Sequence, residues 1–400
     1  MRRSLGFVAL AGVLVMAGCW PVSGQNLHRS SHNAVEAGFD AGAVAGFTEL
    51  WTAHTDEVPG LGRGTGHPVL ADDGAVLVTS THSAYAFDSA TGAQRWARTP
   101  SPSTYAEVDT DGAVFNGSYY VSLRRTGGSG GVWEPGQFDL ADGFWFTGEI
   151  NGRQEAVRAD PFTALFSEFS APPGSPGAQT AFLFIGGSLR VEVTQLPNSS
   201  RLTLGADRIF HAGVGSGTAP ANGVRSYPVD GSPGWATPID GTIATSPVLS
   251  DDESVVFVGT DQGTLHALAT ATGSLLWSTP VGAAVTAPPA LAEGVLYVPT
   301  ASGSLVAVAD TGATLWSTST PAGSAIGVQP AAAAGVVFTG HDDGTLQGFD
   351  AAGCGAATCD PVWSTTTGSR ITGAPAVSGA TVFVGTADGR LVAYGLPAPG

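Results

Sequence analysis

Short runs of hydrophobic residues, each bounded by glycine-containing turns, recur along the second half of the chain. The run VVFVG at Val255 to Gly259 is typical, and runs of this length that are rich in Val, Leu and Phe predict β-strands. No stretch between Thr48 and Gly400 keeps a helical period over a dozen residues. The pattern therefore predicts an all-β chain.

The strand pattern repeats at a regular spacing. A turn glycine marks the same place in four successive copies, at Gly263, Gly303, Gly344 and Gly389, with intervals of 40, 41 and 45 residues. Repeats of this length have room for four strands each. We therefore expect a closed β-propeller of four-stranded blades.

The last copy lacks one strand, and the missing strand lies at the other end of the chain. APAVSGATVFVGTADGRLVAYGL ends before any Trp, whereas TELWTAH around Trp51 is a Trp strand with no repeat in front of it. We expect the N-terminal strand to complete the last blade, because that arrangement closes the ring and removes both free sheet edges. Counting gives eight blades, with seven as the alternative.

Composition fits an exported all-β domain. The chain has 57 Gly, 26 Pro and only 12% charged residues, and 43% hydrophobic residues argue against disorder. The net charge of −17 argues against direct binding of nucleic acid or an anionic membrane. All 16 basic residues are Arg, and the lack of Lys excludes a Walker-type phosphate loop and Schiff-base catalysis.

The N-terminus reads as a lipoprotein signal peptide over residues 1–18. Two Arg precede an apolar stretch, and the end Met16-Ala17-Gly18-Cys19 resembles the bacterial lipobox, which implies lipidation of Cys19. An ordinary signal peptide with a chance Cys is the alternative. We expect residues 19–45 to be a tether and 46–400 to be the propeller. The anchor would lie in the outer membrane if the organism has one, and otherwise on the cell surface.

The other two cysteines lie close together in one turn. Cys354 and Cys359 occur in AAGCGAATCDPVW, before Trp363. In an exported protein a local disulfide fits this spacing better than a metal pair. A redox role is disfavoured because the spacing is not C-x-x-C and no cationic neighbour would lower a thiol pKa.

The repeats resemble the pyrroloquinoline quinone (PQQ)-like, quinoprotein-type propeller repeats. The words that carry the resemblance are FDSATGAQRW from Phe87, LATATGSLLW from Leu268 and VADTGATLW from Val308. The resemblance covers residues 46–96 and 205–400. It implies that one Trp of each blade packs on the neighbouring blade, and the residues that fit this role are Trp51, Trp96, Trp235, Trp277, Trp316 and Trp363.

The resemblance fades in the divergent blades of residues 97–204. FLFIGGSLRVEV in this segment predicts one hairpin, and Thr126 to Gly131 forms a glycine-rich loop. Trp133 and Trp145 lie outside the repeated Trp positions, so they are the candidates for an aromatic platform under a cofactor. If a function is grafted onto the ring, we expect it in this segment.

No catalytic or metal residues of the family's enzymes can be placed on the sequence. Those enzymes hold PQQ and calcium at the central mouth and in several members have a disulfide between adjacent cysteines, which this chain lacks. Acidic pairs such as Asp251-Asp252 and Asp342-Asp343 are typical of turns. Asp109 to Gly112 begins like a calcium loop but lacks the later Glu. His82 and His341 align in the same turn and are expected to be exposed on one rim.

Two functions from different classes follow. The favoured one is a non-enzymatic, lipid-anchored, monomeric scaffold that binds a protein partner in the cell envelope and uses no cofactor. The alternative is a PQQ-dependent oxidoreductase, with calcium, or a hydrolase of envelope polymers, with its site at the propeller mouth. A cluster of acidic and amide side chains at one mouth would distinguish the alternative.

Overall fold

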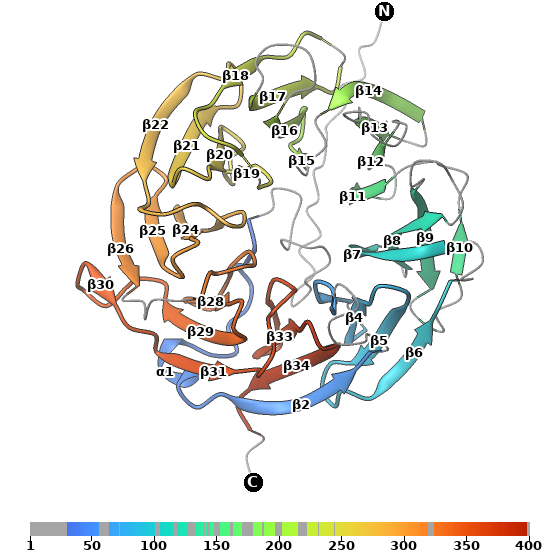
Figure 1. The fold of residues 1–400 in the computed structure, drawn as a ribbon, viewed down its shortest axis with the longest axis vertical. Coiled ribbons are helices and arrows are strands. Elements are labelled where there is room, and N and C mark those ends of the chain that lie inside the picture. Colours follow the sequence, from blue (N-terminus) through green and yellow to red (C-terminus); the bar gives the residue numbers. More distant parts are fainter. Residues whose placement is uncertain are drawn as a thin grey trace, which may run out of the picture.

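In the computed structural model the strands that the structure describes form eight sheets around a central axis (Figure 1). The structure describes residues 30–397 with gaps at 56–63, 72, 101–104, 116–117, 126–132, 140, 142–144, 148–152, 161–162, 170–178, 186–187, 197–201, 215–221, 231, 244 and 319–323, and between 105 and 202 it gives the course of the strands without their side chains. The closed β-propeller expected from the sequence is therefore the fold of the chain.

Each sheet is one blade, and its strands run antiparallel in chain order. The first four blades consist of β3 (Val69–Leu70), β4 (Ala75–Thr79), β5 (Ala84–Asp88) and β6 (Gln94–Arg98); β7 (Tyr105–Phe115), β8 (Ser118–Arg125), β9 (Trp133–Asp139) and β10 (Trp145–Thr147); β11 (Arg153–Asp160), β12 (Thr163–Phe169), β13 (Gln179–Ile185) and β14 (Ser188–Leu196); and β15 (Leu202–Leu204), β16 (Arg208–Val214), β17 (Asn222–Pro228) and β18 (Ala236–Pro238).

The later blades repeat this order with two added short strands. They consist of β19 (Val248–Leu249), β20 (Val255–Gly259), β21 (Thr264–Ala269) and β22 (Leu275–Pro280); β23 (Ala290–Ala292), β24 (Val295–Pro299), β25 (Leu305–Ala309) and β26 (Thr314–Thr318) with β30 (Thr358–Cys359); β27 (Ala331–Ala333), β28 (Val336–Gly340), β29 (Thr345–Asp350) and β31 (Trp363–Thr366) with β1 (His32–Asn33); and β32 (Ala376–Ser378), β33 (Thr381–Gly385) and β34 (Arg390–Gly395) with β2 (Thr48–His54).

The N-terminal strand completes the last blade, as predicted. β2 pairs antiparallel with β34, and Trp51 lies opposite Ala393. The first and last parts of the chain therefore share one sheet, and the ring closes through ordinary strand pairing rather than through packing alone.

In the blades whose side chains are described, the second and third strands are largely buried, because each face packs against a neighbouring blade. All five residues of β4 are buried, for example. The middle of the second strand holds a large side chain in each well-described blade, namely Leu77, Phe257, Tyr297, Phe338 and Phe383. This packing explains why these strands read as continuous hydrophobic runs rather than as an alternating pattern.

Residues 30–45 are not a tether, contrary to the expectation from their composition. The N–H of Leu291 in β23 donates to the Ser30 carbonyl at 2.7 Å, and β1 pairs in parallel with β27. The buried Asn33 side chain donates to the Val377 carbonyl in β32 at 2.9 Å. This segment therefore lies across the innermost strands of three blades, and a tether could extend no further than residue 29.

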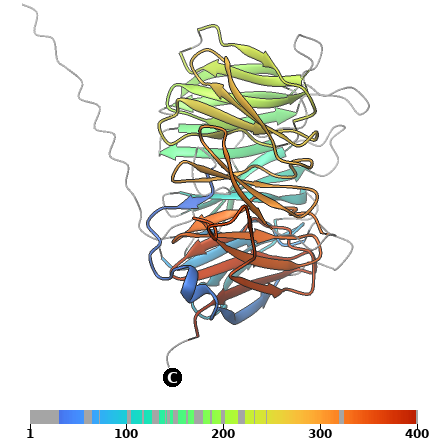
Figure 2. The ribbon, with the colours of Figure 1, turned by 90° about the vertical axis from the view of Figure 1, so that its left-hand side faces the viewer.

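A short helix, α1 (Ala41–Val44), continues this docked segment. The Asp40 carboxylate caps it by accepting the Ala43 N–H at 2.8 Å. Val44 is buried, and the ring of Phe39 packs edge-on against Phe338. The edge-on view in Figure 2 shows the segment before β2 against one side of the ring. Among the helices described, none has the length and apolar character to cross a membrane.

The divergent residues 97–204 contribute two four-stranded sheets, β7 to β10 and β11 to β14. β13 and β14 form the predicted hairpin. Asp109 to Gly112 lies within β7 and is thus part of a strand rather than a calcium loop. The loop Thr126 to Gly131 falls outside the described residues.

Candidate functional site

The repeated Trp residues lie between blades. The indole N–H of Trp51 in the last blade donates to the Ser89 carbonyl in the first blade at 3.0 Å. Three other copies make the same kind of bond across to the next blade: Trp235 to Thr270 at 2.7 Å, Trp277 to Asp310 at 2.8 Å and Trp363 to Phe47 at 3.1 Å. Trp96 is buried as well. These Trp side chains therefore join neighbouring blades and stabilise the ring.

A turn glycine lies directly against three of these indoles. Gly92 has a φ of +70°, and a Cβ there would lie 2.6 Å from the Trp51 ring. Gly273 (φ +71°) and Gly312 (φ +92°) lie in the same way against Trp235 and Trp277. The Gly of the ATG and DTG words is therefore required both by its backbone conformation and by the close approach of the ring.

Trp316 departs from this pattern. It is 3% exposed, yet its indole N–H has no hydrogen-bond acceptor. The following turn is the long one that contains the two cysteines, and the carbonyl of Ala351 there accepts the Tyr297 hydroxyl at 2.9 Å instead. Burial raises the pKa of Tyr297, so the hydroxyl stays protonated and able to donate.

Cys354 and Cys359 form a disulfide within this long turn. The turn reaches back to the preceding blade, where β30 pairs in parallel with the outer edge of β26. The Ser317 N–H donates to the Ala357 carbonyl at 2.9 Å, and Cys359 is buried beside Trp316. The disulfide turn thus fastens two neighbouring blades together.

The candidate site is the face that carries the turns between the second and third strands, which we call the turn face. A hydroxyl closes most of these turns: Thr260 donates to the Thr264 carbonyl at 3.3 Å, Thr300 to Ser304 at 2.6 Å and Thr386 to Arg390 at 3.1 Å. All three threonines are buried. The repeat therefore uses this position to fix turn geometry.

His341 occupies the same position in its blade, and the expectation that it is exposed is wrong. It is buried, with Nε2 3.2 Å from the Thr339 hydroxyl and Nδ1 3.2 Å from the Ser324 carbonyl. The imidazole replaces the turn-closing hydroxyl and bonds to the loop that enters the same blade. The expected pair of His on one rim is therefore not formed with His341.

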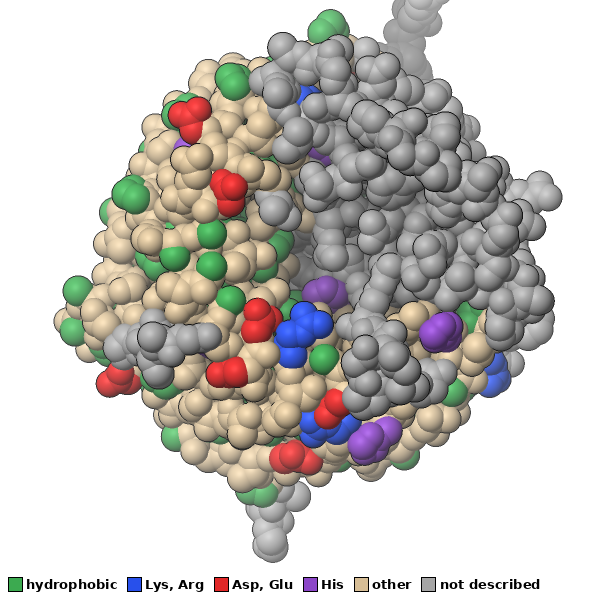
Figure 3. Space-filling model, viewed as in Figure 1, with side chains coloured by type: hydrophobic (Ala, Val, Ile, Leu, Met, Phe, Trp, Pro, Cys, Tyr) green, Lys and Arg blue, Asp and Glu red, His purple; other side chains and the backbone are tan. Residues whose placement is uncertain are grey.

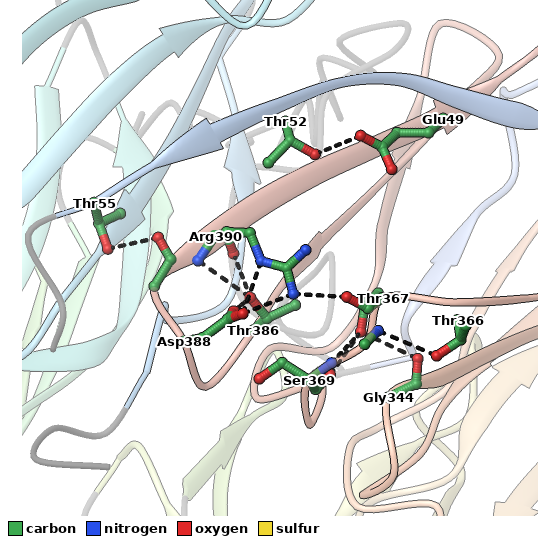
Figure 4. Close-up of polar contacts among 12 residues, drawn as sticks. Glu49, Thr52, Thr55, Gly344, Thr366, Thr367, Ser369, Thr386, Asp388 and Arg390 are labelled. Atoms are coloured by element: carbon green, nitrogen blue, oxygen red, sulfur yellow. Dashed lines mark hydrogen bonds and ion pairs between the residues drawn. The ribbon is translucent and has the colours of Figure 1, made fainter. Parts of the chain in front are cut away.

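Arg390 and Asp388 form the main ion pair of the turn face (Figure 4). Arg390 Nε donates to Asp388 at 2.9 Å, and its Nη2 donates to the Thr367 carbonyl of the preceding blade at 2.6 Å. The single hydroxyl proton of Thr386 is shared between the Arg390 carbonyl and the Asp388 carboxylate, which is the nearer acceptor at 2.6 Å. Burial opposes ionisation of Asp388, but the bonds from Arg390 and Thr386 outweigh it and hold its pKa below the ordinary value.

The seam between the first and last blades is also held by polar bonds on this face. The Ala374 N–H donates to Nδ1 of His67 at 2.7 Å, which places the proton of a neutral His67 on Nε2. Thr372 donates to the Thr65 carbonyl at 2.7 Å. These groups join the two ends of the ring.

The acidic pairs behave as turn residues, as predicted. Asp73, Asp252 and Asp343 each accept a backbone N–H two residues ahead, at 2.9 to 3.0 Å. Hydrogen bonds from Ser250 and Ser254 lower the pKa of Asp252 to about 2. These carboxylates are thus engaged by their own turns.

The carboxylates of the described part of the ring are dispersed. Calcium needs six to eight oxygen ligands, mostly carboxylates and carbonyls. Among the described residues no group of three or more His, Cys, Asp or Glu could hold a metal ion. Three innermost strands, β23, β27 and β32, read ALA, AAA and AVS, so they carry no charged side chain.

Two other sets of predicted site residues have no described side chains. Trp133 and Trp145, the candidates for an aromatic platform, are the first residues of β9 and β10. Cys19, the expected lipidation site, lies outside the described residues.

Comparisons with known proteins agree with this architecture. A family model described as outer membrane protein assembly factor BamB matches residues 221–354 and 305–396. No curated protein matches the chain in sequence.

Several solved structures share the fold at low sequence identity. Quinohemoprotein alcohol dehydrogenase from Comamonas testosteroni has a TM-score of 0.70 at 14% identity, with 96% of this chain and 81% of that chain covered. A europium-containing methanol dehydrogenase has a TM-score of 0.69 at 13% identity (95% and 98% covered), and BamB from Moraxella catarrhalis has 0.59 at 14% identity (87% and 99% covered).

The sheets and the docked Trp residues define a β-propeller protein. Over residues 221–396 its later blades match the family model of PQQ-like repeats.

Proposed function

We propose that the chain is a non-enzymatic, lipid-anchored scaffold that binds a protein partner in the cell envelope. The observation that carries the proposal is that three chemically capable side chains of the turn face are engaged in holding the ring together. Asp388 is bound by Arg390 and Thr386, His341 bonds to a neighbouring loop, and His67 accepts a backbone N–H. The match to the BamB family model supports an envelope role.

The anchor in this proposal is an acyl group on Cys19, with the signal peptide of residues 1–18 removed. The lipobox-like end Met16 to Cys19 supports it. Metabolic labelling with a radioactive fatty acid tests this part: label should enter the wild-type chain and not the Cys19→Ser variant. Label in both would refute lipidation at this residue.

Binding of a protein partner is tested by crosslinking in the native envelope. A photoreactive amino acid placed at exposed positions around the ring should yield a discrete crosslinked species that depends on the position of the probe. A ring that crosslinks to nothing from any position would contradict the scaffold role.

A PQQ-dependent oxidoreductase is the second candidate, and the fold likeness to the two dehydrogenases supports it. A calorimetric titration of the purified protein with PQQ, with and without calcium, separates the two functions. Saturable, calcium-dependent heat would favour the enzyme, and its absence together with a crosslinked partner would favour the scaffold.

A further inference from the structure

Two neighbouring blades carry the same tetrapeptide in their outermost strands. Leu276 to Thr279 in β22 and Leu315 to Thr318 in β26 both read LWST. The tetrapeptides also have the same register. Ser278 lies opposite His266, the third residue after Gly263, and Ser317 lies opposite Val306, the third residue after Gly303. The two edges are therefore matched in sequence and in backbone position.

In one of these blades the outer edge is already occupied by an extended segment. β30 pairs in parallel with β26, with Ser317 opposite Thr358, and the Ser317 N–H donates to the Ala357 carbonyl. Within this chain, therefore, one LWST edge already pairs with an added strand. The paired residues of that strand are small and uncharged.

The matching edge of β22 is open in the part of the chain that the structure describes. No strand there pairs with its outer side, and the Ser278 N–H points outward by analogy with Ser317. Leu275 and Leu276 beside it are 53% and 52% exposed. Figure 3 shows hydrophobic side chains along the left-hand rim of the ring, where β22 and β26 lie.

The first blade shows how such an edge is protected when no strand covers it. Arg95 of β6 holds the position of Leu276, one residue before the blade's Trp, and pairs with Asp73 and Asp88 at 3.0 and 3.1 Å. Charged edge residues discourage strand addition. β22 has no charged residue, and Pro280, which lacks an N–H, ends the edge. Its pairing surface is thus short and unprotected.

We propose that the β22 edge of residues 276–279 binds an extended segment of a partner protein as a fifth, parallel strand. The segment is uncharged over its paired residues, as Ala357 to Cys359 is. Backbone hydrogen bonds would provide the pairing, and the two exposed leucines would provide apolar contact. This inference rests on the proposed scaffold function and assigns it a surface.

The probe for the test is a fluorescent peptide of residues 351–362, closed by its Cys354–Cys359 disulfide. It is titrated into the purified full-length protein and followed by anisotropy. We expect saturable binding that falls at least tenfold in Leu276→Arg, which copies the protected first blade. Leu315→Arg is the matched control, because it changes the same tetrapeptide where the edge is already covered, and binding should persist.

The outcomes separate the possible occupants of the edge. No saturable binding, or equal loss in both variants, would overturn the proposal. Sedimentation of the protein alone identifies a second copy as occupant: a dimer that Leu276→Arg dissociates would also overturn it. Because the titration needs no envelope, its failure alongside a crosslinked partner would refute the β22 edge and leave the scaffold function standing.

Discussion

The indole ring of Trp51 lies directly against Gly92, so the strand that closes the ring is held by a residue with no side chain. A Cβ at Gly92 would come within 2.6 Å of the ring, and the φ of +70° is itself unfavourable for other residues. The joint between the last and first blades therefore depends on this glycine.

Gly92→Ala should destabilise the protein by a few kcal/mol, because overpacking adds about 1–3 kcal/mol to the backbone penalty of about 1–2 kcal/mol. Gly335→Ala is the matched control: its φ is +73°, and nothing lies within 4 Å of the added Cβ. Urea denaturation of both variants measures the difference. Equal losses would show that the contact with Trp51 contributes nothing.

Trp316→Phe should cost less stability than Trp363→Phe. Both indoles are buried, but only Trp363 has an acceptor, the Phe47 carbonyl at 3.1 Å. Removing the Trp363 N–H leaves a buried carbonyl unpaired, which costs about 1–3 kcal/mol, whereas Trp316 loses a donor that has no partner. Chemical denaturation of the two variants tests this. A larger loss for Trp316→Phe would contradict it.

A dithiol reductant should lower the stability of the protein by about 2 kcal/mol, as expected for a short disulfide-closed loop. The cysteines are 5 residues apart in sequence. The Cys354→Ser/Cys359→Ser variant should show the lower stability from the start and should not respond to the reductant. The measurement is denaturation with and without reductant, and a wild-type protein that does not respond would refute a stabilising role for the disulfide.

Stability should fall as the pH drops below about 6.5. Burial lowers the pKa of His266 and of His32 below their ordinary value of 6.5, although nearby carboxylates act in the opposite direction. The unfolded chain therefore takes up these protons at a higher pH than the folded one, so stability is complete above 6.5 and is lost on acidification. Asp252 and Asp388, whose pKa values are lowered, titrate further down the scale.

His266→Asn isolates part of this effect. Denaturation between pH 8 and 5 should show a shallower decline in the variant than in the wild type. Parallel curves would mean that His266 titrates alike in the folded and unfolded states.

The sequence was sufficient for the ring and for its closure because both follow from repetition. The missing Trp strand after Gly395 and the isolated strand around Trp51 are complementary, and no other pairing removes both sheet edges. The Cys354–Cys359 disulfide could be predicted from its short spacing in an exported chain. These features are local or periodic, so the sequence alone is enough to predict them.

The missed features depend on contacts between distant parts of the chain. His341 looked like an exposed turn residue, but its position in the repeat is one where a buried threonine closes the turn in other blades. Residues 30–45 looked like a tether because they have no strand pattern, although Phe39 and Val44 are apolar residues that a docked segment would bury. The docking of β1 on β27 is parallel and joins distant residues, which no local pattern reveals.

The bonds that join Asn33 to Val377 and Phe47 to Trp363 span 344 and 316 positions of sequence. During synthesis, Asn33 and Phe47 therefore cannot form these bonds until almost the whole chain has been made. Contacts of such long range form slowly, because the cost of closing the loop comes before any gain. We expect the ring to lock in one late step and, unlike an open repeat array that frays from its ends, to unfold as a single unit.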